Sequence, residues 1–219
     1  MLQRPILYLI TSGETTDRTT PSSEAYRNTL QLIQAAVTAR IDLVQIREKD
    51  LSASVLYDLS TSAAAITRGS ATRLLINDRA DIAVAAGADG VHLTTRSLVA
   101  SIVRQTFGDD LLIGVSTHSL EEARTAHEGG ADFVVFGPVF ATTSKAEHGE
   151  PTGLDVLKRI CSELSPFPVM ALGGLRSDRV TSCIQAGAAG VAGISMFNDP
   201  DRLGELARGV RQSMSEPPA

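Results

Sequence analysis

Eight short apolar runs recur along the chain, and polar or amphipathic segments separate them. The runs begin at Ile6, Leu43, Arg73, Gly90, Leu111, Phe133, Pro168 and Gly190. They are rich in Val, Ile and Leu and do not alternate with polar residues, which is typical of strands buried on both faces of a parallel sheet. The pattern therefore predicts eight parallel strands.

The segments between these runs have the start and stop signals of helices. Residues that favour helix N-termini occur at Ser22-Ser23-Glu24, Ser52, Ser119 and Ser177-Asp178. Their side-chain oxygens can accept hydrogen bonds from the first free N–H groups of a helix. Gly129-Gly130 and Gly187 stand where two of these helices should end, because glycine adopts the left-handed conformation that follows many helices.

Strand and helix alternate with short links, which predicts an α/β fold. Eight units in an unbroken chain favour a single (β/α)8 TIM barrel, one domain over residues 1–219 with a core of about 6–212. The alternative is an open doubly wound sheet, which usually has a Gly-rich first turn. The turn after the first run is Thr11-Ser12-Gly13-Glu14, which lacks that pattern.

Composition narrows the range of partners. Twenty basic and 25 acidic residues among 219 give a net charge of -5, which argues against a nucleic-acid partner. No apolar run approaches the roughly 18 residues that span a bilayer, so no membrane partner is expected. The first residues do not resemble a signal peptide, and two cysteines 22 positions apart do not indicate a disulfide scaffold. We expect a cytoplasmic protein.

Active sites of TIM barrels lie where the strands end. Gln45, Arg47 and Lys49 follow the second run at alternate positions, so they share one face of the strand. With Lys145 from the long loop over 140–151, the two cations would form a pocket for a polyanion. The alternative is a solvated strand end with local ion pairs.

Three other strand ends carry groups that suit a phosphorylated ligand. Asn77-Asp78 closes the third run, and one carboxylate with substrate phosphate oxygens can hold Mg²⁺. The alternative is an Asx turn or a cap for the helix that begins at Arg79. Gly173-Gly174 and Gly193-Ile194-Ser195 end the last two runs, which is the usual phosphate site of these barrels.

Among the histidines and cysteines, His118 is the candidate for a catalytic role. His118 follows a strand end and is either a proton carrier or a residue that caps the next helix. His92 lies within an apolar run and is interpreted as a hydrogen-bonded structural residue. His148 matches no zinc-ligand spacing. Cys161 and Cys183 are interpreted as small packing residues.

In this order, the strand-end residues resemble those of the thiamine phosphate synthase family, whose superfamily includes the thiazole tautomerases. The matching segments are VQIREKD, LLINDRADIA, GADGVHL, IGVSTHSLEEA, GADFVVFGPVF followed by TTSK, ALGG and GAAGVAGIS. They span roughly residues 6–198. The combination of IREKD, INDR and the TxSK loop is specific, whereas ALGG or GADGVHL alone would occur in many barrels.

The resemblance implies a transferase that condenses 4-amino-2-methyl-5-pyrimidinylmethyl diphosphate with thiazole phosphate, giving thiamine phosphate and pyrophosphate. The pyrimidine substrate would contact Gln45, Arg47, Lys49 and Asn77. The leaving pyrophosphate would be stabilised by Ser116 and Lys145. The thiazole phosphate would be bound by Thr142, Ser144, Gly174, Ile194 and Ser195. Asp78 would be the predicted Mg²⁺ ligand, and a homodimer is expected from the family alone.

One position departs from the family pattern. After GVHL the synthases usually carry Gly-Gln and then an acid that binds the metal, but here Ser97 stands at the position of the acid. Thiazole tautomerases also lack this acid, although they generally lack the Asn-Asp pair too. The alternatives are therefore a cofactor-free tautomerase, in which His118 would move a proton, and a non-catalytic relative that binds thiamine intermediates. Asp78, Arg47 and Lys49 favour the synthase.

Overall fold

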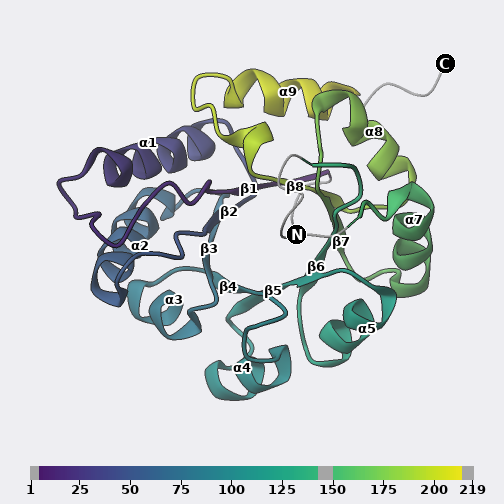
Figure 1. Cartoon of the computed structure of the whole chain (residues 1–219), viewed down its shortest axis with the longest axis horizontal. Helices are drawn as coiled ribbons and strands as arrows, with labels where there is room; N and C mark the ends of the chain where they lie inside the picture. Colours follow the sequence, from purple (N-terminus) through teal and green to yellow (C-terminus); the bar gives the residue numbers. More distant parts are fainter. Residues whose placement is uncertain (1–4, 143–149, 214–219) are drawn as a thin grey trace.

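The apolar runs form strands that pair in sequence order and close into a barrel (Figure 1). We analysed a computed structural model, which describes residues 5–142 and 150–213. In this part of the chain the strands are β1 (Ile6–Ile10), β2 (Leu43–Ile46), β3 (Arg73–Asn77), β4 (Gly90–Leu93), β5 (Leu112–Thr117), β6 (Phe133–Phe136), β7 (Val169–Leu172) and β8 (Gly190–Gly193). β8 pairs in parallel with β1, so the sheet has no open edge. The predicted TIM barrel is confirmed.

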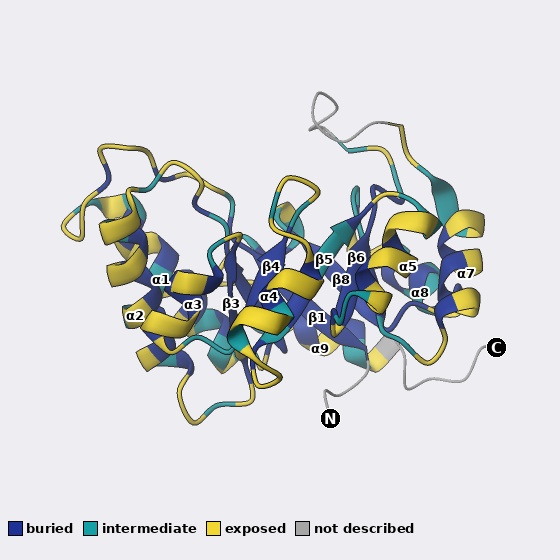
Figure 2. Ribbon diagram, turned by 90° about the horizontal axis from the view of Figure 1, so that it is seen from below, coloured by how far each residue is buried: buried dark blue, intermediate teal, exposed yellow. Residues whose placement is uncertain are grey.

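Helices surround this barrel. The described residues form α1 (Glu24–Thr38), α2 (Ala53–Thr67), α3 (Ala80–Ala86), α4 (Ala100–Phe107), α5 (Leu120–Glu128), α7 (Gly153–Leu164), α8 (Ser177–Gln185) and α9 (Leu203–Ser213). A short 3-10 helix, η1 (Ser195–Phe197), follows β8. Figure 2 shows buried strands at the centre, with exposed positions on the outer helix faces and in the loops. None of the described helices is both long and apolar enough to cross a membrane.

Strand alternation divides the apolar residues between two cores. On β1, Leu7 and Leu9 belong to the outer core between strands and helices, whereas Ile6, Tyr8 and Ile10 belong to the core inside the barrel. This inner core also contains Leu43, Leu75, Phe133, Val135 and Met170. Tyr8 is fully buried there, so the barrel interior contains a hydroxyl group as well as apolar side chains.

Gly114 on β5 creates space inside the barrel. A Cβ at this position would come within 2.3 Å of the Phe133 ring and 2.8 Å of Nδ1 of His92. Real Cβ atoms do not approach other heavy atoms so closely. The absence of a side chain at Gly114 therefore allows the Phe133 and His92 rings to lie against β5.

Helix starts follow the sequence signals in part. Ser52 and Ser119 accept hydrogen bonds from the N–H groups of Val55 and Glu122, as N-caps do. Ser23 stands at the N-cap of α1, but its hydroxyl accepts a hydrogen bond from the N–H of Thr20 and thus stabilises the preceding turn. Helix α8 begins at Ser177 itself, with Arg176 at the N-cap, one residue earlier than a Ser177 cap would allow.

Candidate active site

A cavity of about 290 Å³ opens where the strands end. It gathers side chains from the ends of β2, β3, β5 and β8 that lie far apart in the sequence. The predicted site residues that line it are Gln45, Arg47, Lys49, Asn77, Asp78, Ser116, His118 and Ile194. Strand-end chemistry predicted from the sequence is thus collected in one place.

The remaining predicted residues fall into two groups. Thr142, Gly174 and Ser195 are described but are not among the residues that line this cavity. Lys145 and Ser144 lie outside the described residues, as does His148. The long loop over 140–151 that carries Lys145 therefore lies largely outside the described residues.

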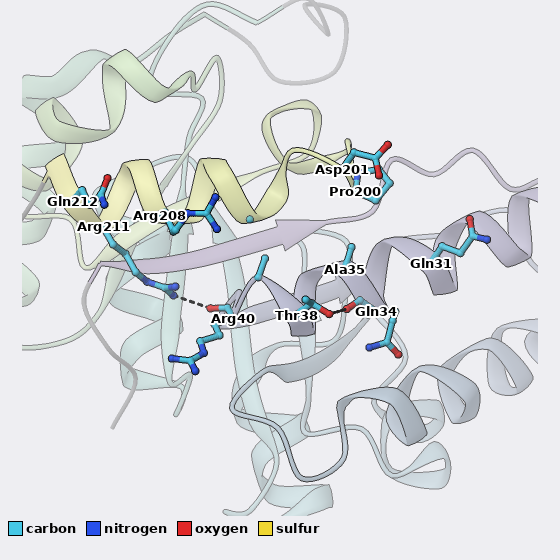
Figure 3. Close-up of a pocket in the computed structure, with 12 residues that line it drawn as sticks. Gln31, Gln34, Ala35, Thr38, Arg40, Pro200, Asp201, Arg208, Arg211 and Gln212 are labelled. Atoms are coloured by element: carbon cyan, nitrogen blue, oxygen red, sulfur yellow. Dashed lines mark hydrogen bonds between the residues drawn. The ribbon is translucent and has the colours of Figure 1, made fainter.

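Two larger hollows lie away from these strand ends. One is a surface groove of about 970 Å³ between α1 and α9, shown in Figure 3, where Arg211 donates a hydrogen bond to the carbonyl of Arg40. The other, of about 890 Å³, lies near Asp42 and Asp89, which precede the strands β2 and β4. Both are more open, and neither contains the residues that the strand-end pattern predicts. Position and chemistry therefore select the smaller cavity.

The buried amides of Gln45 and Asn77 line the cavity, and the buried Tyr8 supports them from beneath. The Tyr8 hydroxyl donates to Oε1 of Gln45 over 3.0 Å, and Nε2 of Gln45 donates to Oδ1 of Asn77 over 2.9 Å. Nδ2 of Asn77 then donates to the Asp78 carboxylate over 2.9 Å. Burial raises the pKa of Tyr8 well above its usual value, so its hydroxyl keeps its proton.

His92 lies between Tyr8 and Ser116 and is 2% exposed. Its Nδ1 is 3.1 Å from the Tyr8 hydroxyl oxygen, and its Nε2 is 2.9 Å from Oγ of Ser116. Burial lowers the pKa of His92 from 6.5 to about 4, and the positive charge of Arg47 also lowers it, while the negative charge of Asp78 opposes the shift. The ring is therefore neutral at neutral pH. Both ring nitrogens are hydrogen-bonded, as the sequence interpretation expected, and the ring also lines the cavity.

Glu48 connects the first two strand ends. Its carboxylate accepts hydrogen bonds from the hydroxyls of Thr11 and Thr15, at 2.5 and 2.6 Å, and from the N–H groups of Gly13 and Thr15, both at 3.2 Å. The Thr11 hydroxyl oxygen also accepts a hydrogen bond from the N–H of Arg47. Glu48 is 4% exposed, and it holds the loop after β1 against the segment that carries Arg47.

Asp78 directs its carboxylate toward neighbouring polar side chains. Its φ of 60° is in the left-handed region, and α3 takes Arg79 as its N-cap, so the alternative that Asp78 caps this helix is wrong. Besides Asn77, the carboxylate accepts hydrogen bonds from the hydroxyls of Ser97 and Thr94.

Magnesium prefers such hard oxygen ligands and often takes only one or two protein carboxylates together with substrate phosphates and water. No cluster of three or more metal-ligating side chains occurs among residues 5–142 and 150–213. The Asp78 carboxylate and the two hydroxyls beside it are oxygen donors of the kind that Mg²⁺ prefers.

His118 lies at the cavity and also contacts the next helix, whose N-cap is Ser119. It is exposed at the cavity, where its Nδ1–H donates to the carbonyl of Gly137 over 2.6 Å. Its backbone N–H donates to Glu122 in the first turn of α5, also over 2.6 Å. His118 is thus part of the start of this helix, and its ring is held at the cavity wall.

A glycine and apolar residues line the other side of the cavity. Gly137 lines it with Leu172 and Ile194, and Gly173 and Gly174 follow β7 with φ values of 100° and 59°. A Cβ on Gly174 would come within 2.3 Å of the carbonyl oxygen of Ala141. Only glycine therefore allows the loop after β6 to approach the end of β7 this closely.

Comparison with known proteins agrees with this geometry. A family model described as thiamine monophosphate synthase matches residues 7–197. The chain belongs to this family. The resemblance drawn from the strand-end residues is confirmed.

Members of the thiamine monophosphate synthase family cover most of this chain. A relative from Geobacter sulfurreducens is 46% identical over 80% of this chain and 82% of its own. The thiamine-phosphate synthase of Moorella thermoacetica is 36% identical over 85% of this chain and 88% of its own. The solved structure of thiamine phosphate pyrophosphorylase from Pyrococcus furiosus superposes with a TM-score of 0.79 at 27% identity, covering 96% of this chain and 97% of that one.

Sequence reasoning missed two residues of this site. Tyr8 shares the inward face of β1 with Ile6 and Ile10, and a tyrosine at such a position needs a partner for its hydroxyl. Glu48 stands between Arg47 and Lys49, so strand alternation placed it on the opposite face from the site. Alternation alone could not show that a loop folds back onto that face.

Proposed function

We propose that this chain is a thiamine-phosphate synthase that joins a phosphorylated pyrimidine to a phosphorylated thiazole at the mouth of the barrel. The family match and the relatives support a transferase of this kind. The observation that carries the proposal is the convergence of Gln45, Arg47, Lys49, Asn77, Asp78 and Ser116 on one cavity. The roles below are those that their positions favour.

Arg47 and Lys49 lie on the cavity wall and are proposed to bind the diphosphate of the pyrimidine substrate. Departure of pyrophosphate leaves a pyrimidinylmethyl cation, which the pyrimidine ring stabilises. Fixed positive charge favours this step because it stabilises the negative charge that grows on the leaving group. Lys145 is proposed to add a third positive charge. The thiazole nitrogen then attacks the cationic carbon, so no nucleophile from the protein is required.

Asp78 is proposed to hold Mg²⁺, with the hydroxyls of Ser97 and Thr94 beside it. When bound, the ion neutralises charge on the leaving diphosphate. The Asp78 carboxylate also fixes the amide of Asn77, which in turn holds Gln45. Gln45 and Asn77 are proposed to place the pyrimidine, and Ser116 is proposed to contact the same substrate.

The thiazole phosphate is proposed to bind at the side of the cavity lined by Gly137, Leu172 and Ile194. Ser195 directly follows Ile194 after β8, and Gly174 stands at the end of β7. Free N–H groups at such strand ends are the usual phosphate ligands of TIM barrels. Thr142 and Ser144 are proposed to complete this site.

A two-substrate assay tests the proposal. Purified protein should release pyrophosphate and form thiamine phosphate with magnesium, and chelation or Lys145→Ala should abolish the release. Turnover of a thiazole carboxylate phosphate without magnesium, lost in His118→Ala, would instead support a tautomerase. Tight binding of either substrate without turnover under any metal condition would support a non-catalytic binding protein.

Three further expectations accompany this function. We propose a single domain, a homodimer and a cytoplasmic location. Light scattering of the purified protein tests the homodimer, and the cell fraction that contains the protein tests its location. Limited proteolysis that leaves one resistant fragment spanning most of the chain would support the single domain.

A further inference from the structure

A continuous row of hydrogen bonds crosses the barrel from β5 to the end of β3. It connects Ser116, His92, Tyr8, Gln45, Asn77 and Asp78, with each separation between 2.9 and 3.1 Å. Five neighbouring strands, β1 to β5, each contribute a residue. Because each link can carry only one proton, the direction of one hydrogen bond constrains the next.

The Asp78 carboxylate sets the direction at one end, because a carboxylate only accepts. Asn77 must therefore direct its NH2 group toward Asp78 and its oxygen toward Gln45. Gln45 must then direct its NH2 group toward Asn77, which leaves its oxygen facing Tyr8. Tyr8 has a single proton, and it donates that proton to Gln45.

The same logic extends to the other end of the row. The Tyr8 oxygen can only accept from His92, so Nδ1 of His92 carries a hydrogen. Both partners of the ring are uncharged hydroxyls and the ring is buried, which favours the neutral form. Nε2 then holds a lone pair and accepts the proton of the Ser116 hydroxyl.

We propose that His92 is a positioning residue, held by Tyr8 as the tautomer protonated on Nδ1, and that it turns the lone pairs of Ser116 toward the cavity. The ring cannot readily exchange its two edges, since it packs against the Tyr8 and Phe133 rings with centroid distances of 5.7 and 6.2 Å. Its position is thus fixed by packing as well as by hydrogen bonds.

This order determines what Ser116 offers to a substrate. A hydroxyl that donates to His92 faces the cavity as an acceptor, which suits an N–H donor such as the amino group of an aminopyrimidine. It does not suit a fully ionised phosphate oxygen, which offers no hydrogen. The inference therefore departs from the contact between Ser116 and the leaving pyrophosphate that the family resemblance implied. This part of the inference rests on the proposed function, whereas the tautomer of His92 does not.

NMR of the free protein labelled with ¹⁵N at histidine tests the tautomer directly. His92→Asn identifies the signals of His92 among the four histidines. At neutral pH the wild type should show a protonated Nδ1 and an unprotonated Nε2. A proton on Nε2, or on both nitrogens, would overturn the inference without any measurement of activity.

Tyr8→Phe removes the oxygen that fixes the tautomer and keeps the packed ring. In this variant the His92 spectrum should shift toward the Nε2-protonated form, and kcat/KM for the pyrimidine substrate should fall about tenfold. Tyr26→Phe is the matched control, because Tyr26 is also buried and its hydroxyl contacts Ser62 between α1 and α2. This control should change neither quantity. An unchanged His92 spectrum in folded Tyr8→Phe would contradict the role of Tyr8.

Two substitutions at His92 separate positioning from packing. Glutamine can place an amide oxygen near the position of Nε2 and accept from Ser116, whereas asparagine is too short and reaches only the position of Nδ1. We expect His92→Gln to retain at least about fivefold more kcat/KM than His92→Asn. Equal losses would indicate that the ring only fills space. Wild-type protein without pyrophosphate release would refute the proposed function and leave the NMR result to decide the tautomer.

Discussion

The two sides of the cavity are lined by different kinds of residue. Strands β1 to β5 supply side chains, among them the buried Gln45, Asn77 and His92, and Tyr8 supports them from inside the barrel. The side formed by β6 to β8 supplies apolar residues, and its turn after β7 depends on glycines with positive φ.

This difference suits the two ligands proposed for the site. A pyrimidine ring has donors and acceptors in fixed directions, and rigid buried amides can match them. A phosphate group accepts hydrogen bonds from many directions, and main-chain N–H groups supply them without a bulky side chain. We infer that the first side sets specificity and that the second side sets affinity for phosphate.

The largest effect should come from the charged end of the first side. Asp78→Asn keeps the shape of the side chain and tolerates positive φ, but it removes the negative charge proposed to hold the metal. Magnesium-dependent pyrophosphate release should fall by about 100-fold or more. Ser97→Ala, the matched change beside it, should cost less than about tenfold. Equal losses in the two variants would show that Asp78 is not the main ligand.

The next largest effect should come from Glu48, whose hydrogen bonds support the first side. Glu48→Gln places an NH2 group where the native carboxylate accepts hydrogen bonds from two hydroxyls and two N–H groups. We expect a loss of about 2 kcal/mol in the free energy of unfolding, measured with urea, since charge-assisted hydrogen bonds are lost. Asp81→Asn breaks an exposed ion pair with Arg79 and should cost less than about 1 kcal/mol. A similar loss in both variants would contradict the role of Glu48.

On the side of the cavity formed by β6 to β8, Gly174→Ala should weaken the binding of thiazole phosphate. The added methyl group would collide with the carbonyl of Ala141 and displace the loop after β6. The KM for thiazole phosphate should rise about tenfold, while the KM for the pyrimidine substrate stays within about twofold. Gly69→Ala, with a φ of 78° and no atom within 4 Å of the new Cβ, controls for backbone strain alone. Equal changes in both KM values would mean that the two sides are not separate.

Lowering the pH should decrease the free energy of unfolding, because His92 is buried in its neutral form. The pKa of His92 is about 4 in the folded protein, below its ordinary value of 6.5, so the unfolded chain binds a proton first as the pH falls. The stabilisation is fully present above pH 6.5 and is lost as the pH falls toward 4. One unit below the ordinary pKa, the loss is about 1 kcal/mol. Thermal unfolding of His92→Gln should lack this loss, whereas His127→Gln, a change at the surface, should keep it.

The barrel was predictable because its signal repeats. Eight apolar runs and their spacing determine the order and parallel pairing of the strands, and strand parity correctly placed Gln45, Arg47 and Lys49 on one cavity wall. Side chains that lie at strand ends in the sequence must meet in space once the barrel closes. This is why Asn77, Asp78, Ser116 and Ile194 could be assigned to the same site.

The parts that sequence could not provide depend on contacts between distant segments. Whether Asp78 caps a helix or faces the cavity depends on its backbone conformation and on the hydroxyls of Ser97 and Thr94, which lie on the next loop. Glu48 gains its partners only when the first loop folds over β2. Neither contact produces a periodic pattern of apolar and polar residues in the sequence.

Gly114 shows how a residue with no functional group can govern chemistry at a distance. Even a methyl group at residue 114 would displace the His92 ring. The proposed His92 tautomer and its hydrogen bonds to Tyr8 and Ser116 therefore depend on the absence of a side chain at Gly114. A relative with alanine at this point must seat its histidine differently, so the identity of that residue should sort homologues by how they orient their substrate.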